Sequence, residues 1–186
     1  MKVIEKQVTQ LTIVGAGRAT GLGEIDPIDV ILEDHGPARG QITINVFGEA
    51  WSHYWPAMGD FGIESFVAKV STHYLANKLR RPDEKFTEID GDELVAKMKH
   101  GVITDRRDKQ IDEREARELW EEIEAFASDE RWGSIGESEA ELLHKTLGDD
   151  WWECMSERTS SHGQYVLDIC AAVQQVLGER VAKVAA

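Results

Sequence analysis

Cysteine is scarce in this chain: Cys154 and Cys170 are the only two among 186 residues. Two cysteines are too few for a disulfide framework, and their spacing is not that of a metal site. Both lie in partly apolar stretches with helical periodicity. We therefore expect them to be reduced, buried thiols that pack as small hydrophobic side chains.

Long hydrophobic runs are also missing. No apolar stretch approaches the roughly 20 residues that a membrane-spanning helix needs. The first ten residues, MKVIEKQVTQ, are interrupted by charges and lack the apolar segment of a signal peptide. Hydrophobic residues make up 41% of the chain and charged residues 30%, which is ordinary for a globular protein. These features predict a cytoplasmic protein with no membrane partner.

Recognisable catalytic patterns are absent from the sequence. The six histidines form no H-x-x-x-H or H-E-x-x-H pair that would bind zinc, and the chain has neither a G-x-S-x-G elbow nor a Walker loop. We therefore predict no enzymatic activity, no metal and no cofactor.

One glycine-rich segment, LTIVGAGRATG at residues 11–21, partly matches the turn of dinucleotide-binding proteins. Gly15 and Gly17 follow an apolar stretch, but Thr20 occupies the sixth position of the motif. Further glycines and a proline interrupt the next residues, so the helix whose N-terminus would bind a pyrophosphate is missing. We interpret residues 15–26 as a loop between strands.

Positive charge is in short supply. The chain has 35 acidic and 21 basic residues, a net charge of −14. Residues 1–60 carry −4 and residues 61–100 carry 0, whereas residues 101–186 hold 20 acidic and 10 basic residues, or −10. Such a field repels nucleic-acid phosphate and attracts basic surfaces. Direct nucleic-acid binding by this half is therefore not expected.

Period-two alternation predicts three β-strands in the first 47 residues, at 8–14, 28–33 and 41–47. In the third, Ile42, Ile44 and Val46 share one face. The connector DHGPARG before it has the turn residues of an antiparallel hairpin.

Apolar residues at three- and four-residue spacing predict helices at 63–79, 90–100, 112–127, 137–147 and 162–184. Capping boxes support two of them, Asp90 with Glu93 and Asp112 with Glu115. Gly101 is expected to end the second helix, which leaves residues 101–111 and 128–137 as loops.

These elements predict an α+β fold, in which a small N-terminal antiparallel sheet of about three strands packs with a helical C-terminal half. We expect residues 1–100 to form the sheet-and-helix core. Residues 101–186 are expected to form an acidic helical region, in the same domain or as a subdomain. The apolar stripe at 162–184 could bury itself or pair two chains, so a homodimer stays open.

A dense aromatic cluster follows the third strand. Trp51, Tyr54 and Trp55 share a face if this stretch is a helical turn. We favour the interpretation that the rings pack at the junction of sheet and helix. The alternative is a contact platform, because aromatic residues are enriched at interface hot spots. Base stacking would need a basic groove alongside, which the nearby sequence does not supply.

Two acidic segments are candidate binding surfaces. The helix DEREARELWEEIE at 112–124 carries carboxylates on two faces, either as a solvated surface with i,i+4 ion pairs or as an imitation of nucleic-acid phosphate. In the second segment we expect Asp149 to cap a short helix, with one of two tryptophans turned inward and the other outward. The candidate partner-binding residues are Glu113, Glu118, Glu121, Glu122, Asp149, Asp150 and Trp151.

Several motifs carry a family resemblance. They are I-T-I at 42–44 followed by G-x-A-W-x-x-Y-W-x-x-M-G at 48–59, D-P-I-x-V-x-L-E-D-x-G-P-x-x-G at 26–40, and G-D-D-W-W at 148–152 before the closing helix. Together they resemble an uncharacterised family of small accessory proteins from bacteriophages and prophages. The resemblance implies a location in the cytoplasm of a host bacterial cell.

The family setting and the acidity together lead to our functional hypothesis, because small acidic phage accessory proteins are frequently inhibitors of host machinery. We expect a non-enzymatic protein that binds a basic surface on a host protein or nucleoprotein complex, for example as an anti-CRISPR or other anti-defence inhibitor. The alternative is a replication or recombination accessory module that binds single-stranded nucleic acid through the Trp/Tyr segment.

Overall fold

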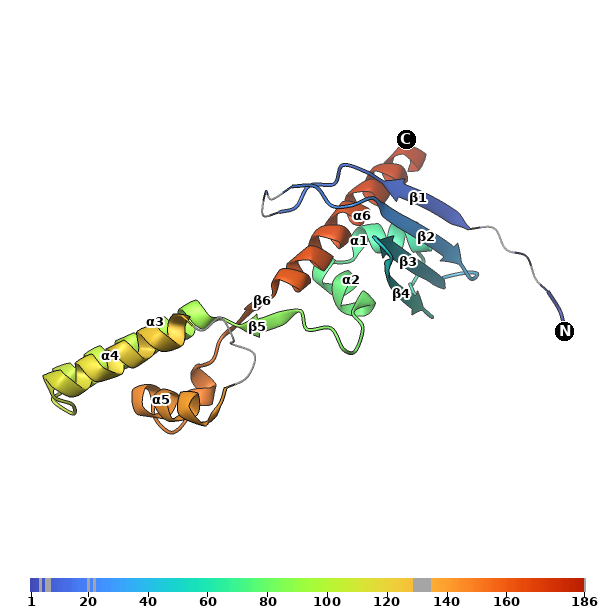
Figure 1. The fold of residues 1–186 in the computed structure, drawn as a ribbon. Helices are drawn as coiled ribbons and strands as arrows, with labels where there is room; N and C mark the ends of the chain where they lie inside the picture. Colours follow the sequence, from blue (N-terminus) through green and yellow to red (C-terminus); the bar gives the residue numbers. More distant parts are fainter. Residues whose placement is uncertain (4, 6–7, 20, 22, 129–134, 186) are drawn as a thin grey trace. The chain divides into compact units, whose positions relative to one another are not determined.

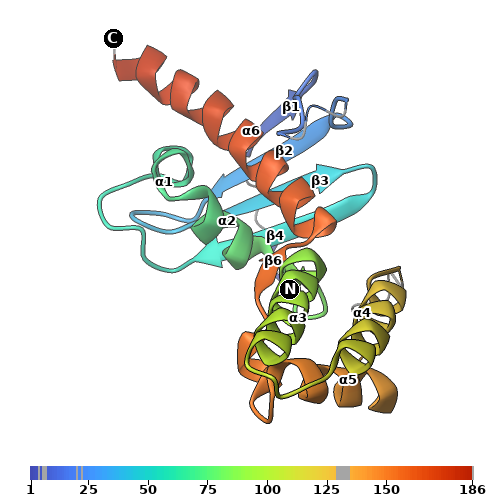
Figure 2. The same ribbon diagram turned by 90° about the vertical axis from the view of Figure 1, so that its left-hand side faces the viewer.

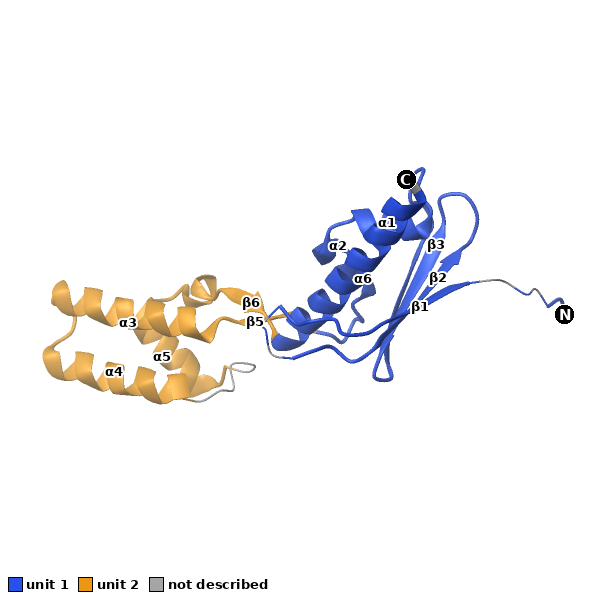
Figure 3. Ribbon diagram, turned by 90° about the horizontal axis from the view of Figure 1, so that it is seen from above, with its two compact units in different colours: residues 1–84, 161–186 blue, residues 85–160 orange. Residues whose placement is uncertain are grey.

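The structure, a computed structural model, describes residues 1–3, 5, 8–19, 21, 23–128 and 135–185. The chain forms two compact units. Unit 1 comprises residues 1–84 and 161–186, and unit 2 comprises residues 85–160 (Figure 3). Unit 2 is therefore inserted into unit 1. The boundary that we placed at residue 100 falls within a helix of unit 2.

Unit 1 is built on an antiparallel sheet, which in its described residues has four strands in the order β1-β2-β3-β4 (Figures 1 and 2). Alternate residues of β2 and β3, such as Ile28, Val30 and Ile44, are fully buried on one face. The α+β fold and the three predicted strands are confirmed, with one strand more than expected. The bounds are β1 (Thr9–Ile13), β2 (Ile28–Asp34), β3 (Gly40–Val46) and β4 (Glu49–Trp55).

The additional strand, β4, contains the aromatic cluster. Phe47 and Gly48 have φ angles of 50° and 87°, and two successive positive φ angles are what a tight type I′ hairpin turn requires. Trp51 and Trp55 are 2% and 3% exposed on the core face, whereas Tyr54 lies on the other face and is 42% exposed. Residues four apart share a face of a strand as well as of a helix. The helical turn that we considered is therefore wrong, and the core position of the two tryptophans is confirmed.

Three helices cover one face of this sheet: α1 (Ile63–Lys69), α2 (Thr72–Leu79) and α6 (Ser161–Ala185) (Figure 2). The single helix predicted at 63–79 is interrupted because Val70 is extended and the Ser71 side chain caps α2, accepting from the Tyr74 N–H at 3.2 Å. The predicted apolar stripe of α6 packs into the core of unit 1. Its buried residues are Val166, Ile169, Cys170, Val173 and Leu177.

Unit 2 begins and ends with a two-stranded ribbon of β5 (Thr87–Ile89) and β6 (Glu157–Thr159). These strands are too short for alternation to reveal them in the sequence. Between them lie α3 (Gly91–Arg107), α4 (Glu113–Ser128), α5 (Glu137–Leu147) and a 3-10 helix, η1 (Trp151–Cys154). The helices share a core of Leu94, Met98, Val102, Leu119, Ile123, Leu142 and Leu143.

Helix α3 does not end at Gly101, as the sequence suggested, but continues to Arg107. A Cβ atom at Gly101 would lie 2.0 Å from the carbonyl oxygen of Thr146 in α5. Glycine at this position therefore permits close approach of two helices and is not a helix end. The loop predicted at 101–111 is accordingly helical over most of its length. The loop predicted at 128–137 falls largely outside the described residues.

Candidate functional site

Helix α4 carries four of the seven predicted contact residues. It starts where predicted: the Asp112 side chain accepts a hydrogen bond from the Glu115 N–H at 2.9 Å, and this bond is the main cause that lowers the pKa of Asp112. The apolar stripe of the helix buries Leu119 and Ile123 in the core of unit 2. The stripe therefore determines which side of α4 remains in water.

All four predicted glutamates of this helix, Glu113, Glu118, Glu121 and Glu122, are exposed. Glu113 lies 3.5 Å from Arg117, and Glu118 lies 3.6 Å from Arg114. These are i,i+4 pairs between largely exposed side chains, and such pairs contribute about 0.3–0.5 kcal/mol. They constrain the carboxylates only weakly, so the acidic side of α4 is accessible to a partner.

The second predicted cluster follows α5. Gly148, with a φ of 87°, ends that helix, and Asp149 and Asp150 are both exposed. Asp149 does not cap a short helix, because η1 begins directly after Asp150; the Asp149 carboxylate instead lies 2.5 Å from Nε2 of His144. The residue that precedes η1 is Asp150, and its backbone carbonyl, not its side chain, accepts from the Glu153 N–H at 2.9 Å.

The two adjacent tryptophans of η1 have different environments. Trp151 is half-buried and packs against the core of unit 2, whereas Trp152 is 52% exposed. Their rings are in an edge-to-face arrangement with centroids 6.0 Å apart. Trp120 on α4 is also exposed, at 36%, and Nζ of Lys99 lies 5.1 Å from its ring. Sequence reasoning did not select Trp120 or Trp152. Trp120 could have been found, because it directly follows the inward-facing Leu119.

The acidity of the chain is concentrated in unit 2. Residues 85–160 hold 22 acidic and 11 basic residues, a net charge of −11, while unit 1 accounts for the remaining −3. The sheet-and-helix unit is thus almost neutral. All seven predicted contact residues belong to the charged unit.

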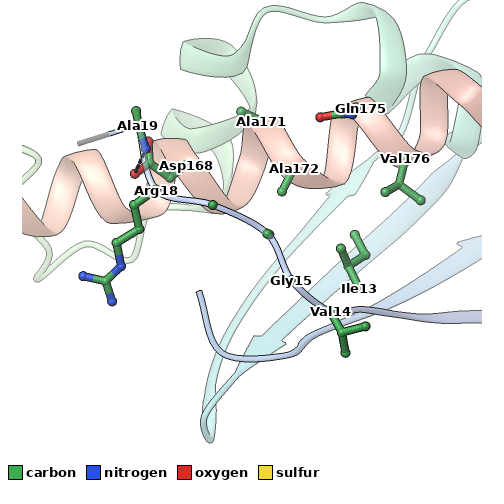
Figure 4. A pocket seen from close by; sticks show the side chains of 12 residues that line it. Ile13, Val14, Gly15, Arg18, Ala19, Asp168, Ala171, Ala172, Gln175 and Val176 are labelled. Atoms are coloured by element: carbon green, nitrogen blue, oxygen red, sulfur yellow. Dashed lines mark hydrogen bonds between the residues drawn. The ribbon is translucent and has the colours of Figure 1, made fainter. Parts of the chain in front are cut away.

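A shallow cavity of about 510 Å³ lies within unit 1, between the β1–β2 connection and α6 (Figure 4). Its walls are mainly backbone, alanine and aliphatic side chains. The buried Asp168 is already engaged, since it accepts from the Ala19 N–H at 3.2 Å and from the Gln164 amide at 2.7 Å. The glycine-rich segment leads into strand β2 and not into a helix, so it is a loop between strands, as interpreted from the sequence.

A buried carboxylate, Glu84, organises another polar cluster in unit 1. It accepts from the Trp51 indole N–H at 2.9 Å and from the Arg81 backbone N–H at 2.8 Å, and the Arg81 guanidinium lies 2.8 Å away. Burial acts to raise the pKa of Glu84, but these donors, together with the nearby His162, outweigh burial and lower it. The cluster anchors the ring of Trp51, which gives it a structural role.

Metal and thiol chemistry find little support among the described residues. They contain no group of three or more His, Cys, Asp or Glu side chains placed to hold a metal ion. Burial raises the pKa of the Cys170 thiol to about 12, which makes this cysteine a packing residue. Cys154 is half-buried in η1. Within the same residues, no helix combines the length and apolar character that crossing a membrane requires.

Comparison with known proteins gives one result. Neither a curated protein nor a solved structure matches the chain. The family model Phage_phiTE_072, described as a phage family, matches residues 1–179. The match extends through both units and includes the acidic helices and the aromatic strand. The chain therefore belongs to this phage family.

Proposed function

We propose that this phage-family protein is a non-enzymatic binding protein that docks unit 2 on a basic surface of a host protein or nucleoprotein complex and inhibits that complex. An anti-defence inhibitor, such as an anti-CRISPR protein, is the specific form of this proposal. Its main support is the concentration of exposed carboxylates in unit 2, which carries −11 of the net charge of −14.

The spacing of charge on α4 is consistent with imitation of a nucleic-acid strand. Six glutamates lie between Glu113 and Glu124. At about 1.5 Å rise per residue they span about 16 Å of helix axis, or about one carboxylate every 3 Å. This compares with one phosphate per roughly 3.4 Å along a DNA strand. A basic groove that holds nucleic acid would therefore attract this helix.

Exposed aromatic rings give unit 2 a further means of binding a partner. Tryptophan is enriched among residues that dominate binding energy, and charge contributes more to the rate of encounter and to specificity. About half of the Trp152 side chain is exposed to solvent. Trp151, which we predicted as the anchor, is half-buried, and its ring packs edge-to-face against that of Trp152. We therefore add Trp152 to the proposed contact residues.

Charge reversal tests the proposal directly. The variant carries Glu→Lys at Glu113, Glu118, Glu121 and Glu122, and the matched control carries Lys at four exposed carboxylates of unit 1, Glu24, Asp60, Asp83 and Glu179. Both variants change the net charge equally. Tagged proteins are used to capture partners from infected host cells, and captured proteins are quantified. We expect the α4 variant to lose its partner by at least about tenfold, which corresponds to about 1.4 kcal/mol.

The salt dependence of partner capture shows whether binding depends on the α4 carboxylates in particular or on the overall negative charge of the chain. Capture by the wild-type protein should fall as salt rises from about 0.05 to about 0.5 M, because screening weakens exposed charge pairs. Residual capture by the α4 variant should change much less over this range, while the unit 1 control should follow the wild type. Equal capture by all three proteins would refute the acidic-surface proposal.

A further inference from the structure

We infer that the free edge of strand β1 is a self-association site, where two copies of this chain pair their β1 strands antiparallel about Leu11 and join their sheets. This inference concerns unit 1 and is independent of the proposed role of unit 2. The observations that carry it are the composition of β1, its position at the edge of the sheet, and the contrast with the opposite edge.

Strand β1 is an unprotected edge. Its only partner strand in the described part of the chain is β2, and it lies at the end of the strand order (Figure 2). Residues 8–14, VTQLTIV, contain no charge, no proline and no glycine, and five of the seven are β-branched. Natural proteins usually protect such edges with lysine, proline, a bulge or a covering element, because free backbone groups recruit further strands.

The other edge strand, β4, is held by its surroundings in unit 1. Helix α2 and the residues after it contact this strand through several side chains. The Trp55 indole donates to the Tyr74 hydroxyl at 3.1 Å, and the Arg81 guanidinium lies 3.8 Å from the carboxylate of Glu49. The described residues before β1, which are residues 1–3, 5 and 8, are by contrast all exposed. Side chains from α2 and the residues after it therefore flank β4, whereas the described residues before β1 are exposed.

The sequence of β1 is complementary to itself. Antiparallel pairing about Leu11 puts Val8 opposite the second copy's Val14 and Gln10 opposite its Thr12, and the two Leu11 side chains meet. Val8 and Val14 are 48% and 71% exposed in the single chain, and Leu11 is half-buried. β-branched cross-strand pairs stabilise sheets. Residues 8–14 are uncharged, so the paired strands bring no charged side chains of their own together.

The cavity beside α6 lies at the end of the same edge. Ile13 and Val14 line it, together with Ala172 and Val176 of α6 (Figure 4). Apolar surface thus continues from the edge strand onto the helix that covers the core face. Seven paired residues bury less than the roughly 1,200 Å² of a standard interface. We therefore expect the dimer to be weak and to form only at high protein concentration.

Sedimentation equilibrium of the full chain tests the self-association. We expect the average mass to rise from 20.9 kDa towards twice this value as the concentration is raised to about 1 mM, where even a weak complex forms. A mass that stays at that of one chain throughout this range would overturn the inference.

Two charged variants test the register. Gln10→Lys with Thr12→Lys puts lysines opposite lysines across the seam, and Gln10→Glu with Thr12→Glu puts glutamates opposite glutamates. Each variant alone should remain monomeric, and an equimolar mixture should recover the dimer, because unlike charges then face each other. The control Ala50→Lys with Ser52→Lys alters the same sheet face at the β4 edge and should dimerise like the wild type. A mixture that stays monomeric, or a dimer lost only in the β4 control, would contradict pairing through β1.

A cross-linking test does not depend on the charged variants folding. In a Cys154→Ser background, Leu11→Cys should form an intermolecular disulfide on mild oxidation, because the two-fold axis puts this residue opposite its own copy at a separation that such a bond can bridge. Thr9→Cys, which would face Ile13 of the second copy, should cross-link at least tenfold less. Equal cross-linking by both variants would argue against this register.

Discussion

Glu84 shows how a single buried side chain can link distant parts of unit 1. Its carboxylate receives the Trp51 indole N–H and the Arg81 backbone N–H and faces the Arg81 guanidinium. Glu84→Gln would remove the charge and leave buried donors poorly matched. We expect the variant to destabilise unit 1 by about 2 kcal/mol, as hydrogen bonds to charged groups typically contribute. Native-state hydrogen exchange of β3 and β4 measures this loss, with the exposed Asp83→Asn as control.

The same residue predicts a pH dependence. The pKa of Glu84 in the folded protein lies below its ordinary value of 4.5. Above that value the carboxylate is ionised in both folded and unfolded chains, so its contribution is complete. As the pH falls below 4.5, the unfolded chain takes up the proton first and the contribution is lost. The stability difference between wild type and Glu84→Gln should thus be constant from neutral to mildly acidic pH and narrow near pH 4. A difference that widens there would contradict the assignment.

Two glycines in helix interiors provide a test at the scale of elements. A Cβ at Gly101 would come within 2.0 Å of the Thr146 carbonyl, whereas a Cβ at Gly178 in α6 would meet nothing within 4 Å. Alanine is preferred over glycine in a helix by about 1 kcal/mol. Gly178→Ala should therefore stabilise unit 1 by up to about this amount. Gly101→Ala should destabilise unit 2 by about 1–3 kcal/mol, because α3 and α5 are forced apart.

Native-state hydrogen exchange measures the free energy of local unfolding at individual amides. Exchange in α3 therefore reports on the stability of unit 2, and exchange in α6 on that of unit 1. A stabilising effect of Gly101→Ala would show that the two helices can separate at no cost.

At the scale of the whole molecule, the way in which unit 2 is connected to unit 1 predicts that each unit folds without the other. The chain enters and leaves unit 2 through a paired ribbon in which the Ser160 N–H donates to the Phe86 carbonyl at 2.9 Å. The two ends of the insertion are therefore adjacent. Unit 1 has its own core on the sheet, and unit 2 has the seven-residue helical core.

We therefore expect residues 85–160 to fold when expressed alone, and unit 1 to fold when a short glycine turn replaces them. NMR spectra of the two fragments, compared with the spectrum of the full chain, provide the measurement. Dispersed amide signals at nearly unchanged positions are the expected result. A collapsed spectrum for either fragment would show that its core is insufficient without the other unit.

Local patterns in the sequence determined the elements whose chemistry is local. Alternation located β1, β2 and β3, apolar spacing located α4, α5 and α6, and the capping residues Asp90 and Asp112 make the predicted backbone contacts. The charge asymmetry and the family motifs were likewise evident, because both depend on composition and order alone. The phage family followed from these motifs and is confirmed.

Only the tertiary structure decided what depends on contacts between distant residues. Phe47 takes a turn position that asparagine usually fills, so β4 was concealed until its pairing with β3 was seen. Gly101 was read as a helix end because the close approach of Thr146 is not encoded near it. Which tryptophan of the 151–152 pair faces water, and which strands lie at the edges of the sheet, were also fixed by packing. The sequence by itself set the charge and the family, and the fold decided which surfaces remain available for partners.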